Sequence, residues 1–257
     1  MISSRQVAAI VLSFGLLQAA AAMTPAKAQN LADMAQAIEQ SKQGNVLLGS
    51  LEIRSGSLKG LQQWVRVISA MRTLGPSFNN CAADAAACTT SVLKKWRSIV
   101  VSAKALPYEE RAKAVNQFFN GWPYKLDMEV WGVREYWATP KEFMSRSGDC
   151  EDYAIAKYYA LRNVGYSEDE VRIVALKDTI RGIGHAVLAV YSGNDILILD
   201  NLSMIVASHT RYKHYKPQVS MNETTRWAHI GGFKADPKAA PTFAKSGLHA
   251  DTLFRKR

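Results

Sequence analysis

Cys150 stands where a sulfur can act as a nucleophile. Asp149, directly before it, is a typical helix N-cap, so the cysteine is predicted to lie in the first turn of a helix. Unpaired backbone N–H groups and the positive end of the helix dipole meet there, which lowers the pKa of a thiol and can hold an oxyanion. A thiolate in this place can attack a carbonyl carbon and form an acyl-enzyme.

Acidic residues beside this cysteine oppose that effect. Asp149, Glu151 and Asp152 place three carboxylates next to the sulfur, and negative charges raise the pKa of a thiol. We therefore expect a positive charge from elsewhere to compensate. Helix capping alone is the other explanation for these carboxylates, and both roles can hold together.

A histidine and an aspartate can be placed near each other by counting across a hairpin. The strand-like runs 185–191 and 196–201 are joined by a turn centred on residues 193–194. With that turn, His185 and Asp200 become diagonal neighbours on one face of the sheet, roughly 7–8 Å apart. An imidazole held by a carboxylate, with a cysteine brought over it, would complete a set of nucleophile, base and orienting residue.

The elements that must position these residues follow from hydrophobic periodicity. Helices are expected over residues 31–42, 61–71 with a cap at Ser57, 92–100, 112–119, 140–147 and 150–164. The helix over residues 140–147 begins with a capping box and is ended by Gly148, and the helix over residues 150–164 is ended by Gly165. Strands are expected over residues 171–176, 185–191 and 196–201. Helices precede strands without βαβ alternation, which predicts an α+β fold with an antiparallel sheet.

The ends of the chain differ in character from its middle. Arg5, an apolar run over residues 7–17 and the sequence Ala26-Lys27-Ala28 are typical of a signal peptide over residues 1–28. The run is too short for a membrane-spanning helix, which is the alternative. We expect one domain over residues 29–232 and a basic tail over residues 233–257. The tail contains six basic residues and two acidic ones.

Composition and cysteine content narrow the class of protein further. The chain has 257 residues, of which 48% are hydrophobic and 21% charged, and this excludes a mostly disordered protein. The formal charge is +10, but export argues against nucleic acid as a partner. Of the three cysteines, Cys81 and Cys88 can pair in an oxidising compartment, which leaves Cys150 as the free thiol. His209 and His214 are expected on the surface rather than as a metal-binding pair.

Five segments carry a resemblance to a known family. They are Trp131-Gly132, residues 136–143 (YWATPKEF), residues 148–158 (GDCEDYAIAKY), residues 185–188 (HAVL) and Leu199-Asp200-Asn201. Together they resemble the bacterial transglutaminase-like cysteine proteinases, whose LapG-type members are periplasmic proteases. The likeness extends over about residues 112–227, and Ala186 stands where those proteases are expected to have methionine.

The resemblance implies a papain-like or transglutaminase core with Cys150 as nucleophile, His185 as base and Asp200 as orienting residue. It also implies a periplasmic location, a large surface adhesin as the protein substrate, and an inner-membrane receptor that responds to cyclic-di-GMP as a partner.

A calcium site beside the nucleophile is a further implication of the resemblance, carried by Asp149, Glu151 and Asp152. Hard oxygen ligands suit Ca²⁺, and the cation would supply the missing positive charge.

The sequence thus predicts an exported, calcium-dependent cysteine peptidase. A transglutaminase that passes the acyl group to an amine is the first alternative, since both enzymes use the same nucleophile. A non-catalytic binding module of the cell envelope is the second, because each of the three residues alone also has an ordinary structural explanation.

Overall fold

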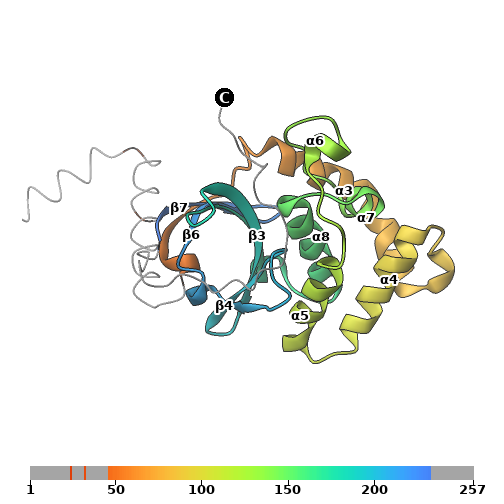
Figure 1. The fold of residues 1–257 in the computed structure, drawn as a ribbon. Helices are drawn as coiled ribbons and strands as arrows, with labels where there is room; N and C mark the ends of the chain where they lie inside the picture. Colours follow the sequence, from red (N-terminus) through yellow and green to blue (C-terminus); the bar gives the residue numbers. More distant parts are fainter. Residues whose placement is uncertain (1–23, 25–31, 33–45, 233–257) are drawn as a thin grey trace, which may run out of the picture.

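The computed structural model describes residues 46–232, together with the single residues 24 and 32. Apart from those two residues, the expected signal peptide, the helix over residues 31–42 and the basic tail lie outside the described residues. Within the described part, helices form a layer on one side of a curved antiparallel sheet (Figure 1). This confirms the α+β class. No described helix is both long enough and apolar enough to cross a bilayer.

The helical layer follows the predicted order along the chain. The described α-helices are α3 (Gln62–Ala83), α4 (Ser91–Lys104), α5 (Tyr108–Phe119), α6 (Asp127–Val130), α7 (Pro140–Arg146) and α8 (Cys150–Asn163). α7 begins with the predicted capping box, in which Thr139 and Glu142 satisfy each other's backbone N–H groups. The prediction of Ser57 as a cap is wrong, because α3 begins five residues later, after Leu61, without a side-chain cap.

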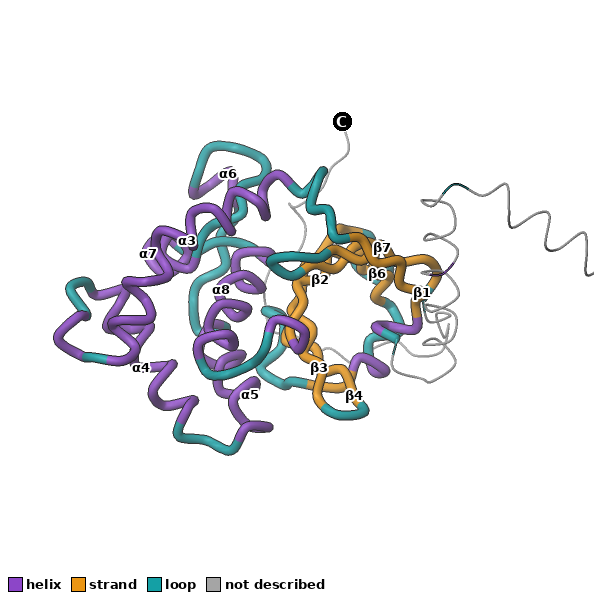
Figure 2. The backbone as a smooth tube through the Cα atoms, turned by 180° about the vertical axis from the view of Figure 1, so that it is seen from behind, coloured by secondary structure: helices purple, strands orange, loops and turns teal. Residues whose placement is uncertain are grey.

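The sheet contains more strands than the sequence predicts. Its order is β1-β7-β6-β2-β3-β4-β5, and all neighbouring strands are antiparallel. The strands are β1 (Ser50–Ser55), β2 (Val171–Asp178), β3 (Ile183–Ser192), β4 (Asp195–Leu199), β5 (Ala207–Ser208), β6 (Tyr215–Met221) and β7 (Arg226–Gly231). Only β2, β3 and β4 are expected from the sequence. The strands curl strongly, as Figure 2 shows.

The hairpin between β3 and β4 has the predicted register. Ser192 pairs with Asp195 around a two-residue turn, and Leu188 pairs with Leu199 at the other end of β4. Because the pairing continues without a bulge, the residue after Leu199 falls on the same sheet face as His185.

Helix α8 lies at the centre of the molecule, between the sheet and the other helices (Figure 1). Every residue from Asp152 to Leu161 is buried, so this helix is enclosed on all sides. Large aromatic side chains fill the space around it, with Trp64 contacting Tyr158 edge to face. A second apolar cluster, which includes Val187 and Tyr215, fills the other face of the sheet. The nucleophile helix therefore rests on a sheet that is packed on both faces.

The fold decides the predictions about the pairing of the cysteines and about the exposure of His209. Cys81 and Cys88 form a disulfide at the connection between α3 and α4, while Cys150 is a free thiol. The expectation that His209 lies on the surface is wrong. It is 3% exposed, and its Nδ1 accepts a hydrogen bond from the backbone N–H of Leu48 because a chain segment before β1 packs over it.

Candidate active site

The start of α8 is built by a close approach between Gly148 and Asp152. A Cβ atom on residue 148 would lie 1.9 Å from Asp152 Oδ2, so a glycine is required there. The same carboxylate accepts a hydrogen bond from the backbone N–H of Asp149 at 3.2 Å. α7 ends at Arg146, and Ser147, its C-cap residue, has a positive φ of 72°, whereas the sequence predicts that Gly148 ends the helix. The glycine instead makes room for the carboxylate that fixes the first turn of α8.

Cys150 occupies the first position of α8, as predicted, and is half-buried. Its thiol donates a hydrogen bond to Glu151 Oε2 at 3.1 Å, and its sulfur accepts one from the backbone N–H of Ala186 on β3. Burial, followed by the charges of Glu151 and Asp149, raises the pKa of the thiol well above its usual value, and the Ala186 N–H only partly opposes this. Among the protein's own groups, burial and the acidic neighbours thus outweigh the hydrogen bond from Ala186.

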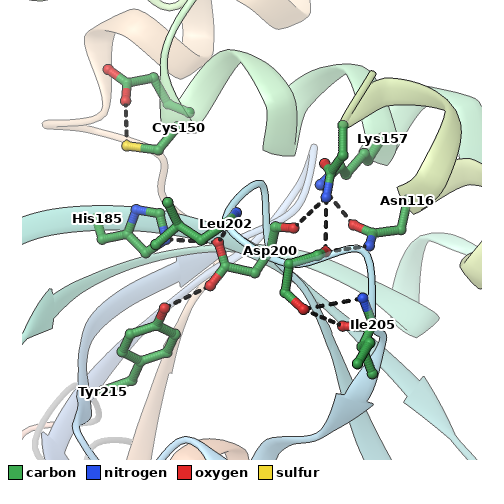
Figure 3. A network of polar contacts seen from close by, with 11 residues as sticks. Asn116, Cys150, Lys157, His185, Asp200, Leu202, Ile205 and Tyr215 are labelled. Carbon is green, nitrogen blue, oxygen red and sulfur yellow. Dashed lines mark hydrogen bonds and ion pairs between the residues drawn. The ribbon is translucent and has the colours of Figure 1, made fainter. Parts of the chain in front are cut away.

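His185 and Asp200 meet beneath the cysteine (Figure 3). His185 Nε2 lies 3.0 Å from Asp200 Oδ1, and both side chains are 2% exposed. The other ring nitrogen, Nδ1, lies on the side of the ring that faces the Cys150 sulfur (Figure 3). The structure therefore brings all three predicted residues together, with one imidazole nitrogen for the carboxylate and the other for the thiol.

The Asp200 carboxylate is held by more groups than the sequence indicates. Oδ1 also accepts the backbone N–H of Leu202 at 3.0 Å, and Oδ2 accepts the hydroxyl of Tyr215 at 2.6 Å. Burial alone would raise the pKa of Asp200, but the His185 charge and these hydrogen bonds outweigh it and lower the pKa to about 2. The carboxylate is therefore ionised at neutral pH, as an orienting residue must be.

A buried acidic cluster, made of Asp127, Asp149 and Asp152, lies beside the nucleophile. One carboxylate oxygen of each residue lies within 4.8 Å of the others, and Asp149 forms a second such group with Cys150 and Glu151. The Oδ1 atoms of Asp127 and Asp149 are buried and have no hydrogen-bond partner among the described residues. Asp127 begins α6, a short helix that the sequence does not predict, and no spacing in the sequence connects it to the cysteine.

The pKa values of the three aspartates in the acidic cluster are all raised. Burial and then the Glu151 charge raise the pKa of Asp149 to about 10 and that of Asp152 well above its usual value. Burial also raises the pKa of Asp127, to about 6. Carboxylates crowded in this way are neutralised either by protons or by a bound cation, and oxygen donors of this kind fit Ca²⁺. Of the three predicted ligands, Asp149 and Asp152 lie in this cluster together with Asp127, whereas Glu151 lies in the second group, beside Cys150.

A known protein family matches more than half of the chain. The profile of the family described as bacterial transglutaminase-like cysteine proteinase matches residues 75–235. No curated protein sequence matches the chain.

Solved structures of LapG from Legionella pneumophila are similar in fold. One is 30% identical, covers 59% of this chain and 85% of its own, and has a TM-score of 0.50. A calcium-bound LapG structure is 27% identical, covers 66% of this chain and 92% of its own, and has a TM-score of 0.51. The residues matched by the family model include every residue named in the candidate site.

Proposed function

Because the chain belongs to the bacterial transglutaminase-like cysteine proteinases, we propose that it cleaves peptide bonds with Cys150 as nucleophile, His185 as base and Asp200 as orienting residue. The observation that carries this assignment is the buried His185–Asp200 hydrogen bond at 3.0 Å, located below a half-buried thiol at a helix N-terminus.

The geometry suits an acyl-enzyme reaction. His185 Nδ1 takes the proton from Cys150 Sγ as the sulfur attacks the carbonyl carbon of the scissile bond. The first backbone N–H groups of α8 stabilise the oxyanion, and His185 then returns the proton to the leaving amine. A water molecule, deprotonated by the same nitrogen, releases the acyl group from the sulfur. Asp200 keeps Nε2 protonated and stabilises the imidazolium throughout.

We propose that calcium is required for this activity. Asp149 and Asp152 with Asp127 would hold the ion, and Glu151 would approach it from the side of the cysteine. A bound divalent cation would neutralise the carboxylates that raise the pKa of the thiol. The unpartnered oxygens of Asp127 and Asp149 and the existence of a calcium-bound LapG structure support this part of the proposal.

The substrate that we propose is a protein of the cell envelope, with a large surface adhesin as the first candidate. Segments on both sides of the site expose apolar side chains suited to a polypeptide, namely Ile180 before β3 and Leu202 and Met204 after Asp200. A periplasmic location agrees with the Cys81–Cys88 disulfide and the expected signal peptide. An inner-membrane receptor that responds to cyclic-di-GMP belongs to the same proposal.

The test uses the chain from residue 29 and its Cys150→Ser variant. Each is incubated with isolated envelope proteins in CaCl₂ or in EGTA, and new N-termini are identified by mass spectrometry. We expect new N-termini only with the wild-type protein in calcium. Asp149→Asn is tested in the same assay because Asp149 is a proposed calcium ligand. Asp169→Asn, which changes an exposed acidic residue, is its matched control.

A second assay separates the alternatives. Dansylcadaverine is offered together with a glutamine-containing peptide. Incorporation of the amine without new N-termini would replace the peptidase by a transglutaminase. If neither reaction occurs while an envelope protein binds tightly, the binding module takes its place.

A further inference from the structure

A buried lysine lies on the nucleophile helix, away from the reacting atoms. Lys157 is 0% exposed, and its Nζ donates to Asn116 Oδ1 on α5 at 2.8 Å. It follows Cys150 by seven residues, which is two helical turns, so both side chains leave the same face of α8. Burying an ammonium group is costly, and here its hydrogen-bond partner is a neutral amide. Packing alone would favour an apolar residue in this place.

The hydrogen bonds of α5 lead from this lysine to the loop that carries Asp200. Asn116 Nδ2 donates to the backbone carbonyl of Ser203 at 2.8 Å. Asn120, one turn later on α5, donates to the backbone carbonyls of Asp200 at 2.7 Å and Ser203 at 2.8 Å. Figure 3 shows these contacts on the side of Asp200 opposite Tyr215.

Asp200 needs such support because it lies just beyond the sheet. β4 ends at Leu199, so ladder hydrogen bonds no longer fix the backbone of the next residue. The side chain of Asp200 is already committed to His185, Leu202 and Tyr215. Its backbone carbonyl is held by Asn120 instead.

We propose that Lys157, Asn116 and Asn120 form an amide clamp that positions Asp200 relative to the nucleophile helix. This inference rests on the proposed function, because Asp200 matters to the reaction only as the partner of His185. The clamp links α8, which carries Cys150, to the loop that carries Asp200. The three members are positioning residues and do not touch the reacting atoms.

The chemistry of lysine explains its place in the clamp. The ammonium form of a lysine side chain offers donors only, so Asn116 turns its oxygen toward Lys157 and its NH₂ group toward Ser203. A methionine of similar length would fill the space and leave the amide free to turn over. A glutamine both donates and accepts, so it could hydrogen-bond to either the oxygen or the NH₂ group of Asn116. The lysine thus fixes the direction in which Asn116 donates.

Asn116→Asp and Asn120→Asp test the clamp with little change of shape. In the first variant the new carboxylate can still accept from Lys157 but cannot donate to Ser203. We expect kcat to fall about 10- to 100-fold with KM nearly unchanged, because a small displacement of an orienting group has effects of this size. Asn163→Asp, at a surface position on α8 where the amide meets Asn79, is the matched control.

A spectroscopic readout makes the test independent of catalysis. In the Cys150→Ser background, the downfield N–H proton resonance of His185 reports its hydrogen bond to Asp200. We expect this resonance to move upfield or broaden in both clamp variants and to stay in place in Asn163→Asp. If Asn116→Asp does not fold, the half-buried Asn120 decides the result.

The outcomes separate the two proposals. An unchanged resonance and an unchanged kcat in Asn120→Asp would overturn the clamp while leaving the peptidase assignment intact. A shifted resonance in a protein that cleaves nothing would support the clamp and overturn the proposed function instead.

Discussion

Helix α8 passes through two buried polar regions that are completed in different ways. At its N-terminus the acidic cluster gathers carboxylates beside Cys150, and two of their oxygens have no hydrogen-bond partner within the part of the chain that the structure describes. Two turns later, Lys157 and both polar atoms of the Asn116 amide have partners within the protein. The first region leaves carboxylate oxygens open to an outside ligand, whereas the hydrogen-bonding groups of the second satisfy one another.

This difference indicates how the work of the site is divided. On the proposal made above, the acidic cluster would govern the charge on the nucleophile and respond to calcium. The amide clamp and the His185–Asp200 pair are held by direct hydrogen bonds and form with the fold itself. Calcium should therefore change the reactivity of the sulfur without rearranging the base, and the following changes test that separation.

The largest effect is expected from Asp149→Asn. Asp149 belongs to both groups of potential ligands, so its loss should abolish calcium binding measured by titration calorimetry. Cleavage in CaCl₂ should fall at least about 100-fold, as expected when metal ligation is disrupted. The exposed Asp169→Asn should match the wild type in both measurements. Full calcium affinity in Asp149→Asn would remove the acidic cluster from the proposal.

Calcium should stabilise the protein through the acidic cluster alone. At a calcium concentration 100 times the Kd, binding to the folded state adds about 2.7 kcal/mol to the free energy of unfolding. The resulting rise in Tm should be the same in Asn120→Asp as in the wild type and absent in Asp149→Asn. A smaller rise in the clamp variant would show that the two regions are coupled.

Tyr215→Phe tests the support of Asp200 from the side opposite the clamp. The hydroxyl donates to Asp200 Oδ2 at 2.6 Å, and removing a hydrogen bond to a charged group costs about 1.5–3 kcal/mol. We expect the pKa of Asp200 to rise from about 2 toward its usual value and kcat to fall about 10-fold. Calcium affinity should not change. Wild-type kcat in this variant would show that the clamp alone holds Asp200.

Lys157→Met should change the pH dependence of stability. Burial lowers the pKa of Lys157 to about 7, although the charge of Asp200 opposes this. Between about pH 7 and pH 10.4 the unfolded chain binds a proton that the folded protein lacks. The stability of the wild type relative to Lys157→Met should therefore rise with pH across this window, by at most about 1.4 kcal/mol per pH unit, and stay constant below it.

Urea unfolding at several pH values measures this difference. The exposed Lys141→Met serves as the control and should follow the wild type at every pH. Parallel curves for Lys157→Met and the wild type would mean that the buried lysine is already charged at neutral pH.

The sequence predicts the parts of the site that depend on local chemistry. The cap at Asp149, the first-turn position of Cys150 and the register of the hairpin all follow from residues close together in the chain. Local signals also predict the capping box of α7. They are less reliable at its end, where Ser147 adopts the positive φ expected for glycine.

Long-range packing decides what the sequence does not predict. Asp127, Tyr215 and Asn116 join the site across separations that no periodicity records. β6 is missed because Pro217 interrupts its strand pattern, and in the structure this proline sits where the pairing with β2 shifts register. β1 and β7 pair across most of the chain, so neither forms a hairpin signal with its sequence neighbour.

The disulfide between α3 and α4 has a practical consequence for counting active molecules. With Cys81 and Cys88 bonded to each other, Cys150 is the single thiol of the chain. Under non-reducing conditions, one equivalent of an alkylating reagent should therefore label each intact site once. Three labels per chain would reveal a preparation in which the disulfide is reduced. The number of labels per chain therefore measures the fraction of molecules with an intact Cys150 thiol.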